Sequence, residues 1–382
     1  MKRREFLALG AGLGAAPMPA VRSEPSPSDR TRAGRTAAVE EERRFWREAA
    51  HYQKLAESKV ECRLCPRRCQ VSDQENGWCG VRFNERGSYY TTVFGRPVTI
   101  ANDPVEKKPL FHFLPGTLTL SLATAGCNFE CLFCQNWEIS QFRPEQVPAR
   151  HGFVSPDDLT RLAQRQNSRS ISFTYSEPVV FFEYALATAR VSKAAGIPGV
   201  MISNGWIEAA PMDELLKELG AVKIDFKAFD PEFYQRQCRG TLEPVLATME
   251  RIRKSGVWLE LVHLTIPTLN DDPEQARRLC GWVLEKLGPD VPVHFTRFHP
   301  TYKLRNLPPT PPAALERQYD IARKAGLRYV YVGNLPGHEG ENTRCHSCRE
   351  MLIRRVGFTV LENRIRQGKC PKCGEKIPGV WG

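Results

Sequence analysis

Three cysteines on one short loop offer the clearest chemistry in this chain: Cys127, Cys131 and Cys134, in the run GCNFECLFCQN. A closed structural zinc site uses four ligands, and ordinary iron–sulfur clusters are held by four cysteines. Three thiolates therefore predict a [4Fe–4S] cluster in which one iron keeps an open position for a further ligand. The alternative is a zinc loop that takes its fourth ligand from elsewhere in the chain.

Four further cysteines precede this loop, and their spacing fits two kinds of metal site. They are Cys62, Cys65, Cys69 and Cys79. Cysteines grouped at CxxC spacing bind metals more often than they form disulfides in a chain of this size. Pro66 and Gly80, each directly after a cysteine, are found in iron–sulfur loops and in zinc loops alike. Zinc and an auxiliary iron–sulfur cluster both remain open.

The last cysteine group consists of two CxxC knuckles near the C-terminus: Cys345, Cys348, Cys370 and Cys373. Such a pair of knuckles predicts a zinc ribbon, and a rubredoxin-like iron site is the alternative. A small module of this kind would depend on its metal to fold. The two isolated cysteines, Cys238 and Cys280, are predicted to be buried as small hydrophobic residues.

The composition is that of a globular protein. Of 382 residues, 41% are hydrophobic and 25% are charged, and the formal net charge is +11. The basic residues are scattered without an interleaved aromatic stripe, so they predict solvated faces and no nucleic-acid partner. Cysteines grouped for metal binding indicate that the cofactors are assembled in a reducing compartment, the cytoplasm.

The N-terminus carries features of an export signal. It begins MKRREFLALGAGL, with Arg3 and Arg4 before a weakly apolar run, and this resembles a twin-arginine signal for export to the periplasm. A disordered basic start is the alternative. The apolar run is too short and too rich in glycine for a membrane span. Residues 22–38, rich in Ser, Pro and Arg, are predicted to be a linker.

Strands and helices alternate regularly from Thr117 onward. Apolar, β-rich runs predict strands at 118–124, 170–174, 199–203, 222–226, 258–265, 291–298 and 329–332. Helical periodicity lies between them, at 156–167, 179–195, 208–219, 241–254, 273–287 and 311–325. Before the alternation, a surface helix is predicted over 37–58 and short strands at 89–94 and 97–100. Strand–helix repetition predicts parallel strands joined by right-handed crossovers.

The fold class expected is therefore α/β, with a partial or near-closed (β/α) barrel. The cysteine triad directly follows the first barrel strand, and active sites of such barrels collect at the carboxyl ends of the strands. Polar residues follow other strands at the same end: Ser176, Glu177, Asn204, Asp225, Lys227 and His299. One such residue would be read as a solvated strand cap, but several in successive loops predict a ligand site.

Four parts are expected along the chain. Residues 1–38 would be the signal and linker, and 39–116 the N-terminal helix with its four-cysteine module. Residues 117–336 would be the barrel, and 337–382 the C-terminal four-cysteine ribbon.

Several long motifs, in order, resemble one family. They are CRLCPRRCQ with GWCGVR, GRPVTIANDPVEKKPLFHFLPG, GCNFECLFCQNWEIS, FTYSEP, KIDFKAF and CPKCGEKIPGVWG. They are similar to radical SAM enzymes of the pyruvate formate-lyase activating enzyme-like group, and more closely to the radical SAM component of the AmmeMemoRadiSam system. The resemblance covers residues 60–382, and Phe133 matches the aromatic residue before the last cysteine of the radical SAM loop.

The resemblance implies roles for individual residues. The cysteine triad would hold the [4Fe–4S] cluster, and S-adenosylmethionine (SAM) would contact Phe133, Ser176, Glu177, Asn204, Asp225, Lys227 and His299. Lys227 would neutralise the SAM carboxylate, and Lys227, Asp225 and His299 would be the catalytic residues. Two departures from the family pattern leave contacts open: Tyr175 and Ser176 replace two glycines, and Ile202 replaces an acidic residue.

The activity implied is reductive cleavage of SAM to a 5′-deoxyadenosyl radical, which abstracts hydrogen from an unknown substrate. The enzyme would be an oxidoreductase that takes electrons from a low-potential donor such as flavodoxin or ferredoxin. It would either activate a glycyl-radical protein or modify a small molecule or partner together with the other AmmeMemoRadiSam components. An alternative interpretation outside the enzymes is a zinc-binding adaptor for nucleic acid or protein.

Overall fold

The computed structural model describes residues 41–382. The twin-arginine segment and the linker expected over 1–38 lie outside the described residues. Residues from Arg44 to Gly382 form one compact unit, and the few described residues before it belong to another. Within the described part, no helix has the length and apolarity needed to cross a membrane.

An eight-stranded sheet forms the centre of this unit. Its strand order is β14-β13-β12-β11-β10-β9-β8-β7, and all neighbours are parallel except β7, which is antiparallel to β8. The strands are β7 (Thr99–Pro104), β8 (Leu118–Ala123), β9 (Ser168–Phe173), β10 (Gly199–Ser203), β11 (Leu219–Asp225), β12 (Trp258–Thr265), β13 (Val293–Arg297) and β14 (Val330–Gly333). The seven predicted parallel strands are confirmed. The strand order is open, as in a partial barrel.

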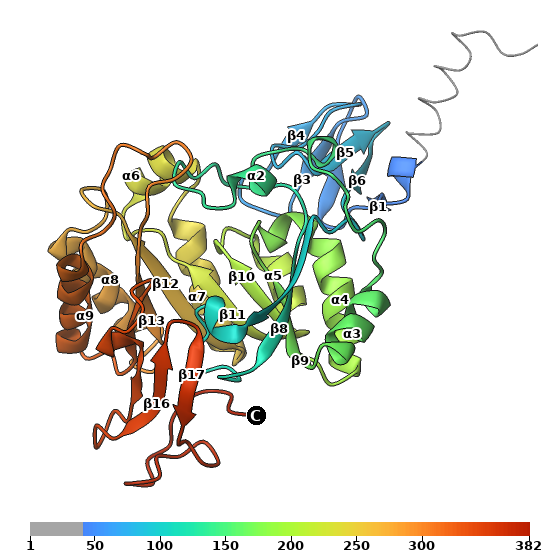
Figure 1. The fold of residues 1–382 in the computed structure, drawn as a ribbon. Coiled ribbons are helices and arrows are strands. Elements are labelled where there is room, and N and C mark those ends of the chain that lie inside the picture. Colours follow the sequence, from blue (N-terminus) through green and yellow to red (C-terminus); the bar gives the residue numbers. More distant parts are fainter. Residues whose placement is uncertain (1–40) are drawn as a thin grey trace, which may run out of the picture. The chain divides into compact units, whose positions relative to one another are not determined.

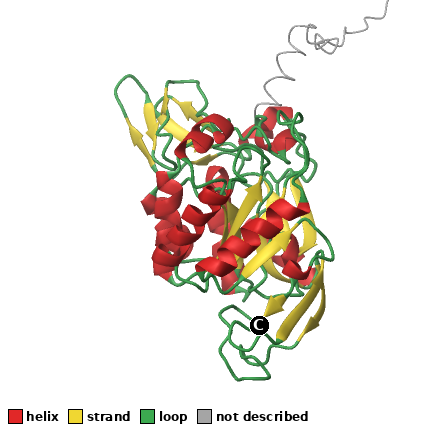
Figure 2. Ribbon diagram, turned by 90° about the vertical axis from the view of Figure 1, so that its left-hand side faces the viewer, coloured by secondary structure: helices red, strands yellow, loops and turns green. Residues whose placement is uncertain are grey.

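Six helices join the parallel strands and pack along one side of the sheet (Figure 1, Figure 2). They are α3 (Pro156–Arg165), α4 (Phe182–Ala194), α5 (Ala209–Leu216), α7 (Glu243–Ser255), α8 (Pro273–Lys286) and α9 (Pro312–Ala325). Each lies where helical periodicity predicted it. Local signals fix several starts: the side chains of Ser155 and Asp272 cap α3 and α8, and proline follows each cap.

The prediction of a helix over 37–58 is wrong from residue 47 onward, where short strands stand in its place. Phe45 and Ala49 are buried. However, β1 (Arg47–Glu48) pairs with β6 (Ser88–Thr91), and β2 (Tyr52–Lys54) pairs with β3 (Val60–Cys62). Pairing with strands farther along the chain outweighs the local helical pattern. The short strands β4 (Gln70–Val71) and β5 (Arg82–Glu85) complete this N-terminal part.

A C-terminal three-stranded sheet lies at the opposite end of the unit from the two small N-terminal sheets (Figure 1, Figure 2). It contains β15 (Thr343–Arg344), β16 (Met351–Val356) and β17 (Thr359–Asn363). The remaining elements are short: η1 (Val105–Lys107), α2 (Trp137–Ser140), η2 (Pro144–Gln146), η3 (Pro178–Phe181), α6 (Pro231–Phe233), the π-helix η4 (Tyr234–Cys238) and η5 (Glu339–Glu341).

Residues 105–116 connect β7 to β8 in the sequence. This segment, which we call the plug, crosses the concave side of the sheet. The backbone N–H groups of Phe111 and His112 donate to the Glu260 carboxylate on β12, at 3.0 and 2.8 Å. The Phe111 ring also packs against the rings of His294 and Tyr331 on β13 and β14. The plug therefore spans from one edge of the sheet to the other.

Glu260 anchors the plug in a fully buried position. Its carboxylate also accepts hydrogen bonds from Trp258 Nε1 at 3.0 Å and from His294 Nε2 at 2.8 Å. Burial acts to raise the pKa of Glu260, but the hydrogen bond from His294 and the nearby histidines outweigh it and lower the pKa. The carboxylate is thus ionised and fully hydrogen-bonded inside the protein.

Replacing Glu260 with alanine should strip four buried donors of their acceptor. We expect Glu260→Ala to lose about 3–5 kcal/mol of unfolding free energy, the range for breaking a buried charged network. Urea unfolding followed by circular dichroism measures this loss. Glu274→Ala, which removes an exposed carboxylate on α8, is the control and should change stability by less than about 0.5 kcal/mol. Equal losses in the two variants would contradict the anchoring role of Glu260.

Candidate active site

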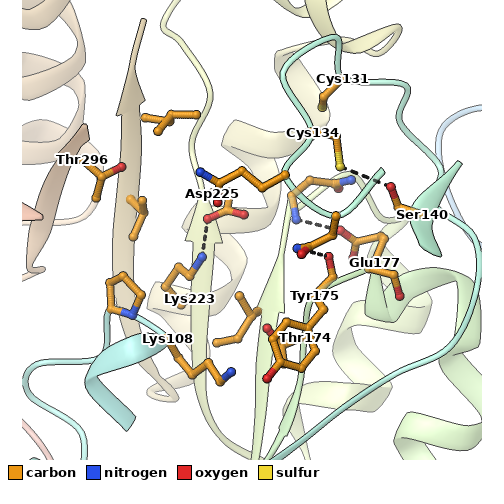
Figure 3. Close-up of a pocket in the computed structure, with 18 of the residues that line it drawn as sticks. Lys108, Cys131, Cys134, Ser140, Thr174, Tyr175, Glu177, Lys223, Asp225 and Thr296 are labelled. Carbon is orange, nitrogen blue, oxygen red and sulfur yellow. Dashed lines mark hydrogen bonds and ion pairs between the residues drawn. The ribbon is translucent and has the colours of Figure 1, made fainter. Parts of the chain in front are cut away.

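A cavity of about 400 Å³ opens at the carboxyl ends of the strands, above the plug (Figure 3). Nine of the site residues predicted from the sequence line it: Cys127, Cys131, Phe133, Cys134, Ser176, Glu177, Asn204, Asp225 and Lys227. His299 does not, because it lies on an exposed loop beyond β13. The structure therefore brings the cysteine triad and all the predicted polar partners except His299 into one pocket.

The cysteine loop is held rigidly from two sides. Gly126 adopts a φ of +94°, and a Cβ there would lie 2.7 Å from the carbonyl oxygen of Cys79, so the loop packs directly on the N-terminal cysteine module. On the other side, Glu130 and Leu132 donate backbone hydrogen bonds to the carbonyls of Cys238 and Gln237, both at 2.9 Å. These acceptors belong to the π-helix η4, a distortion often found at functional sites.

The three sulfur atoms of the loop are not placed for a single metal ion. Around one zinc ion with Zn–S bonds of about 2.3 Å, sulfurs lie about 3.8 Å apart. The sulfurs of Cys127, Cys131 and Cys134 do not all lie within 4.8 Å of one another. Among the described residues, the four C-terminal cysteines are the one group of three or more potential ligands that lies this close together. A wider arrangement suits cysteines that bind separate irons of a cluster. Burial raises the pKa of Cys127, so its thiolate needs a cation such as iron to be stable.

Glu177 and Asn204 are fixed by hydrogen bonds beside the loop. The buried Glu177 carboxylate accepts from Ser203 Oγ at 2.7 Å and from the Asn204 backbone N–H at 2.8 Å. The Asn204 side chain donates to Asn128 Oδ1 at 2.8 Å, and Asn128 in turn donates to a backbone carbonyl. Burial raises the pKa of Glu177 to about 7 although these donors oppose it. Asn128, next to Cys127, was missed by the sequence reasoning.

Asp225 lies between two lysines at the centre of the pocket. Lys223 Nζ contacts one carboxylate oxygen of Asp225, and Lys227 Nζ lies 3.3 Å from the other. Burial acts to raise the pKa of Asp225, but the two lysines hold it at about 2. Lys223 and Asp225 are two residues apart on β11, so both face the concave side of the sheet. Lys223 was missed, although a lysine in a buried strand is itself a signal of a polar site.

The floor of the pocket is built from residues that the sequence reasoning gave no role. Lys107 and Lys108 line it from the plug, and Tyr175 lines it from the loop after β9. Asp103 binds both lysines, at 2.8 and 2.6 Å, and accepts the Tyr175 hydroxyl. Burial acts to raise the pKa of Asp103, but these three donors hold it well below its usual range.

The C-terminal cysteines form a compact group that could hold one metal ion. The sulfurs of Cys345 and Cys373 lie 3.6 Å apart, and those of Cys348 and Cys370 lie 3.7 Å apart. All four sulfurs lie within 4.8 Å of one another, close enough to bind a single ion. These spacings match the sulfur separation of about 3.8 Å around a tetrahedral ion.

The four N-terminal cysteines gather more loosely around a buried arginine. Burial and the neighbouring thiols raise the pKa of Cys65, and burial raises that of Cys79 to about 12. Arg82 is fully buried, and its Nη1 lies 3.7 Å from Cys62 Sγ. The guanidinium also pairs with the Glu183 carboxylate, so its positive charge lies between that carboxylate and the Cys62 sulfur.

Comparison with known proteins gives one family and two informative relatives. Residues 121–280 match the model of the Radical SAM superfamily. An uncharacterized protein of Methanocaldococcus jannaschii is 44% identical over 333 residues, which are 87% of this chain and 98% of that protein. The pyruvate formate-lyase-activating enzyme of Listeria monocytogenes is 24% identical over 173 residues, 41% of this chain and 66% of that enzyme.

Among solved structures, a radical SAM methyltransferase from Sphaerobacter thermophilus has 15% identity and a TM-score of 0.45 over 60% of this chain and 71% of that one. A TM-score this low adds no argument. The superfamily match covers β8 to α8, the stretch that carries the cysteine loop and most of the pocket. The chain belongs to the radical SAM superfamily, and it is a radical SAM enzyme that reductively cleaves SAM and uses the resulting radical to abstract hydrogen from a substrate.

Proposed function

We propose that Cys127, Cys131 and Cys134 hold the [4Fe–4S] cluster and that SAM binds in the adjoining pocket. One observation carries this proposal: the loop with three cysteines and the polar residues at the ends of β9, β10 and β11 line the same cavity. Such a cavity, mostly apolar with a few convergent polar groups, is the usual form of a small-molecule site. The loop supplies three cysteines to the pocket, and Cys238, which contacts Cys131, does not line the pocket, so one iron position would remain for SAM.

Lys227, Glu177 and Asn204 are the residues we assign to SAM. Burial acts to lower the pKa of Lys227, but Asp225 and Cys131 outweigh it and raise the pKa, so the lysine is charged and can pair with the SAM carboxylate. The backbone around Glu177 and Asn204, held by the hydrogen bonds between them, offers fixed polar groups to the amino group and ribose. Fixed partners lower the cost of orienting the cofactor.

When bound, the reduced cluster supplies the electron that breaks a sulfonium C–S bond of SAM. This chain's own residues orient the cofactor and exclude water. Phe129, Phe133, Ile202, Val262 and Leu264 line the cavity with apolar surface. A dry wall protects a reactive radical from side reactions. Together these roles describe an oxidoreductase of the pyruvate formate-lyase activating enzyme-like group.

Within this group, we place the enzyme in the AmmeMemoRadiSam system and not among the glycyl-radical activases. Similarity to the Listeria activating enzyme is confined to 173 residues, whereas the Methanocaldococcus relative extends over 333. The flanking cysteine modules exceed what a plain activase needs. The substrate would then be a small molecule or a partner of that system, with flavodoxin or ferredoxin as the electron donor. Superfamily membership disfavours the zinc-binding adaptor.

Cys127→Ala, Cys131→Ala or Cys134→Ala should abolish SAM cleavage, because each change removes the protein ligand of one iron. We expect 5′-deoxyadenosine formed with dithionite and SAM to fall to the background without enzyme, as measured by liquid chromatography. Cys280→Ala, a buried cysteine on α8 outside the pocket, is the control and should retain the product. Undiminished 5′-deoxyadenosine in the triad variants would overturn the assignment of the cluster.

The flanking groups are proposed to hold different metals. For Cys345, Cys348, Cys370 and Cys373 we propose a structural zinc ribbon, since their sulfurs fit one tetrahedral ion. For Cys62, Cys65, Cys69 and Cys79 we propose an auxiliary iron–sulfur cluster, since their sulfurs are not gathered to the same degree.

Metal analysis of two matched variants separates these assignments. Cys65→Ala should lower iron from about eight to about four atoms per chain and leave zinc unchanged. Cys373→Ala, at an exposed position, should remove about one zinc per chain and leave iron unchanged. Each variant controls for the other. Loss of zinc from Cys65→Ala, with its iron intact, would show that the N-terminal group binds zinc.

The twin-arginine signal is proposed from Arg3 and Arg4 and the weakly apolar run that follows them, and these residues lie outside the described part. Translocase recognition depends on the guanidinium pair and not on charge alone. Arg3→Lys combined with Arg4→Lys should therefore keep the protein in the cytoplasm of its native host, where its cofactors are assembled, while the unchanged chain reaches the periplasm. Fractionation and immunoblotting measure this. Cytoplasmic location of both proteins would refute the signal.

A further inference from the structure

We propose that the floor of the pocket binds an anionic group of the substrate, a carboxylate or a phosphate, through Lys108 with Lys107 and Lys223. This inference rests on the proposed function, because it assumes that SAM and the cluster occupy the upper part of the same pocket. It names the chemical class of the unknown substrate. It also gives the plug a role in selecting that substrate.

Lys108 is placed as a ligand-binding residue would be. It comes from the plug, and its side chain is only 3% exposed. Its Nζ lies 2.6 Å from Asp103 and 4.2 Å from the centre of the Tyr175 ring. Figure 3 shows Lys108 and Tyr175 at the end of the pocket farthest from Cys131 and Cys134. The amine is therefore fixed on the floor, facing the space beneath the cysteine loop.

The cavity wall carries more positive than negative charge. Among the described residues that line it, four are lysines (Lys107, Lys108, Lys223 and Lys227), and two, Glu177 and Asp225, are acidic. Asp103, which pairs with two of the lysines, is not among the lining residues and so lies behind them. With both aspartates and Glu177 ionised, one positive charge is still uncompensated, and protonation of Glu177 leaves two.

SAM and the cluster do not remove this excess. An oxidised [4Fe–4S] cluster with three thiolates carries one net negative charge, and SAM, with a sulfonium and an ammonium against one carboxylate, carries one net positive charge, so the two offset each other before the cluster is reduced. Lys227 is the lysine assigned to the SAM carboxylate. Lys108 lies on the side of the pocket away from the cysteines, Lys107 precedes it on the plug, and Lys223 lines the wall from β11. An anionic substrate would neutralise them.

The lysines themselves are incompletely stabilised in the structure. Burial lowers the pKa of Lys108 to about 8 even though Asp103 opposes the shift. Burial also lowers the pKa of Lys223, against the attraction of Asp225. A desolvated ammonium without full compensation is costly. A structural ion pair would not need three lysines at a cavity wall, whereas a site awaiting an anion would.

Calorimetric titration of two anions tests the proposal on the reconstituted full chain with SAM bound. Inorganic phosphate and succinate are the probes, so that the two arms distinguish a phosphate from a carboxylate substrate. We expect at least one probe to bind. Lys108→Met should weaken that binding about tenfold or more, since one charge-assisted contact is lost. Lys107→Met should weaken it less, and Lys193→Met, on an exposed part of α4, should leave it unchanged.

The outcomes separate this proposal from the proposed function. Two results would refute the anionic substrate, provided that the wild-type protein forms its cluster and cleaves SAM. In the first, the wild-type protein binds neither phosphate nor succinate. In the second, it binds a probe with the same affinity as the Lys108→Met variant. Binding that occurs only without SAM and competes with it would place the lysines in the SAM site and refute it too. If Lys108→Met does not fold, Lys107→Met decides, since Lys107 is 43% exposed. Failure to cleave SAM at all would instead overturn the proposed function.

Discussion

The buried carboxylate of Glu260 holds the plug across the concave side of the sheet, and the shape of the pocket depends on it. Four donors from three parts of the chain converge on this one group. Without it, the backbone N–H groups of Phe111 and His112 would lose their acceptor on β12, and the stacking of His112 on Trp258 would remain as a contact with that strand. Because the plug fills the lower space, the cavity is confined to the carboxyl ends of the strands. The same plug carries Lys107 and Lys108 to the floor.

Above the plug, the site is built from charges held in fixed positions. Asp225 is shared between Lys223 and Lys227, and Glu177 fixes Asn204 through its backbone N–H. Burying so many ionisable groups costs stability, and it is sustained only because each has partners. Such preorganised groups can receive a charged cofactor without rearrangement. The apolar remainder of the wall keeps water away from radical chemistry.

The cysteine loop joins the pocket to the N-terminal module. Gly126 allows the loop to approach the backbone of Cys79, and the Arg67 guanidinium, between two cysteines of the N-terminal group, donates to the Asn128 carbonyl at 3.0 Å. The N-terminal cysteine group and the cysteine triad therefore meet at the contact between Gly126 and the backbone of Cys79. The cysteine loop and the N-terminal cysteine group are thus joined by direct backbone and side-chain contacts.

The parallel strands, the long helices and the grouping of the cysteines could be predicted from the sequence, because periodicity and the spacing of cysteines are local properties of the chain. The sequence also placed the polar residues after β9, β10 and β11 at one end of the sheet. It failed over residues 47–58, where pairing with distant strands replaced a helix. Only the tertiary structure decided the plug and the lysine floor. Glu260 and His112 are 148 residues apart, and no local pattern records a contact over that distance.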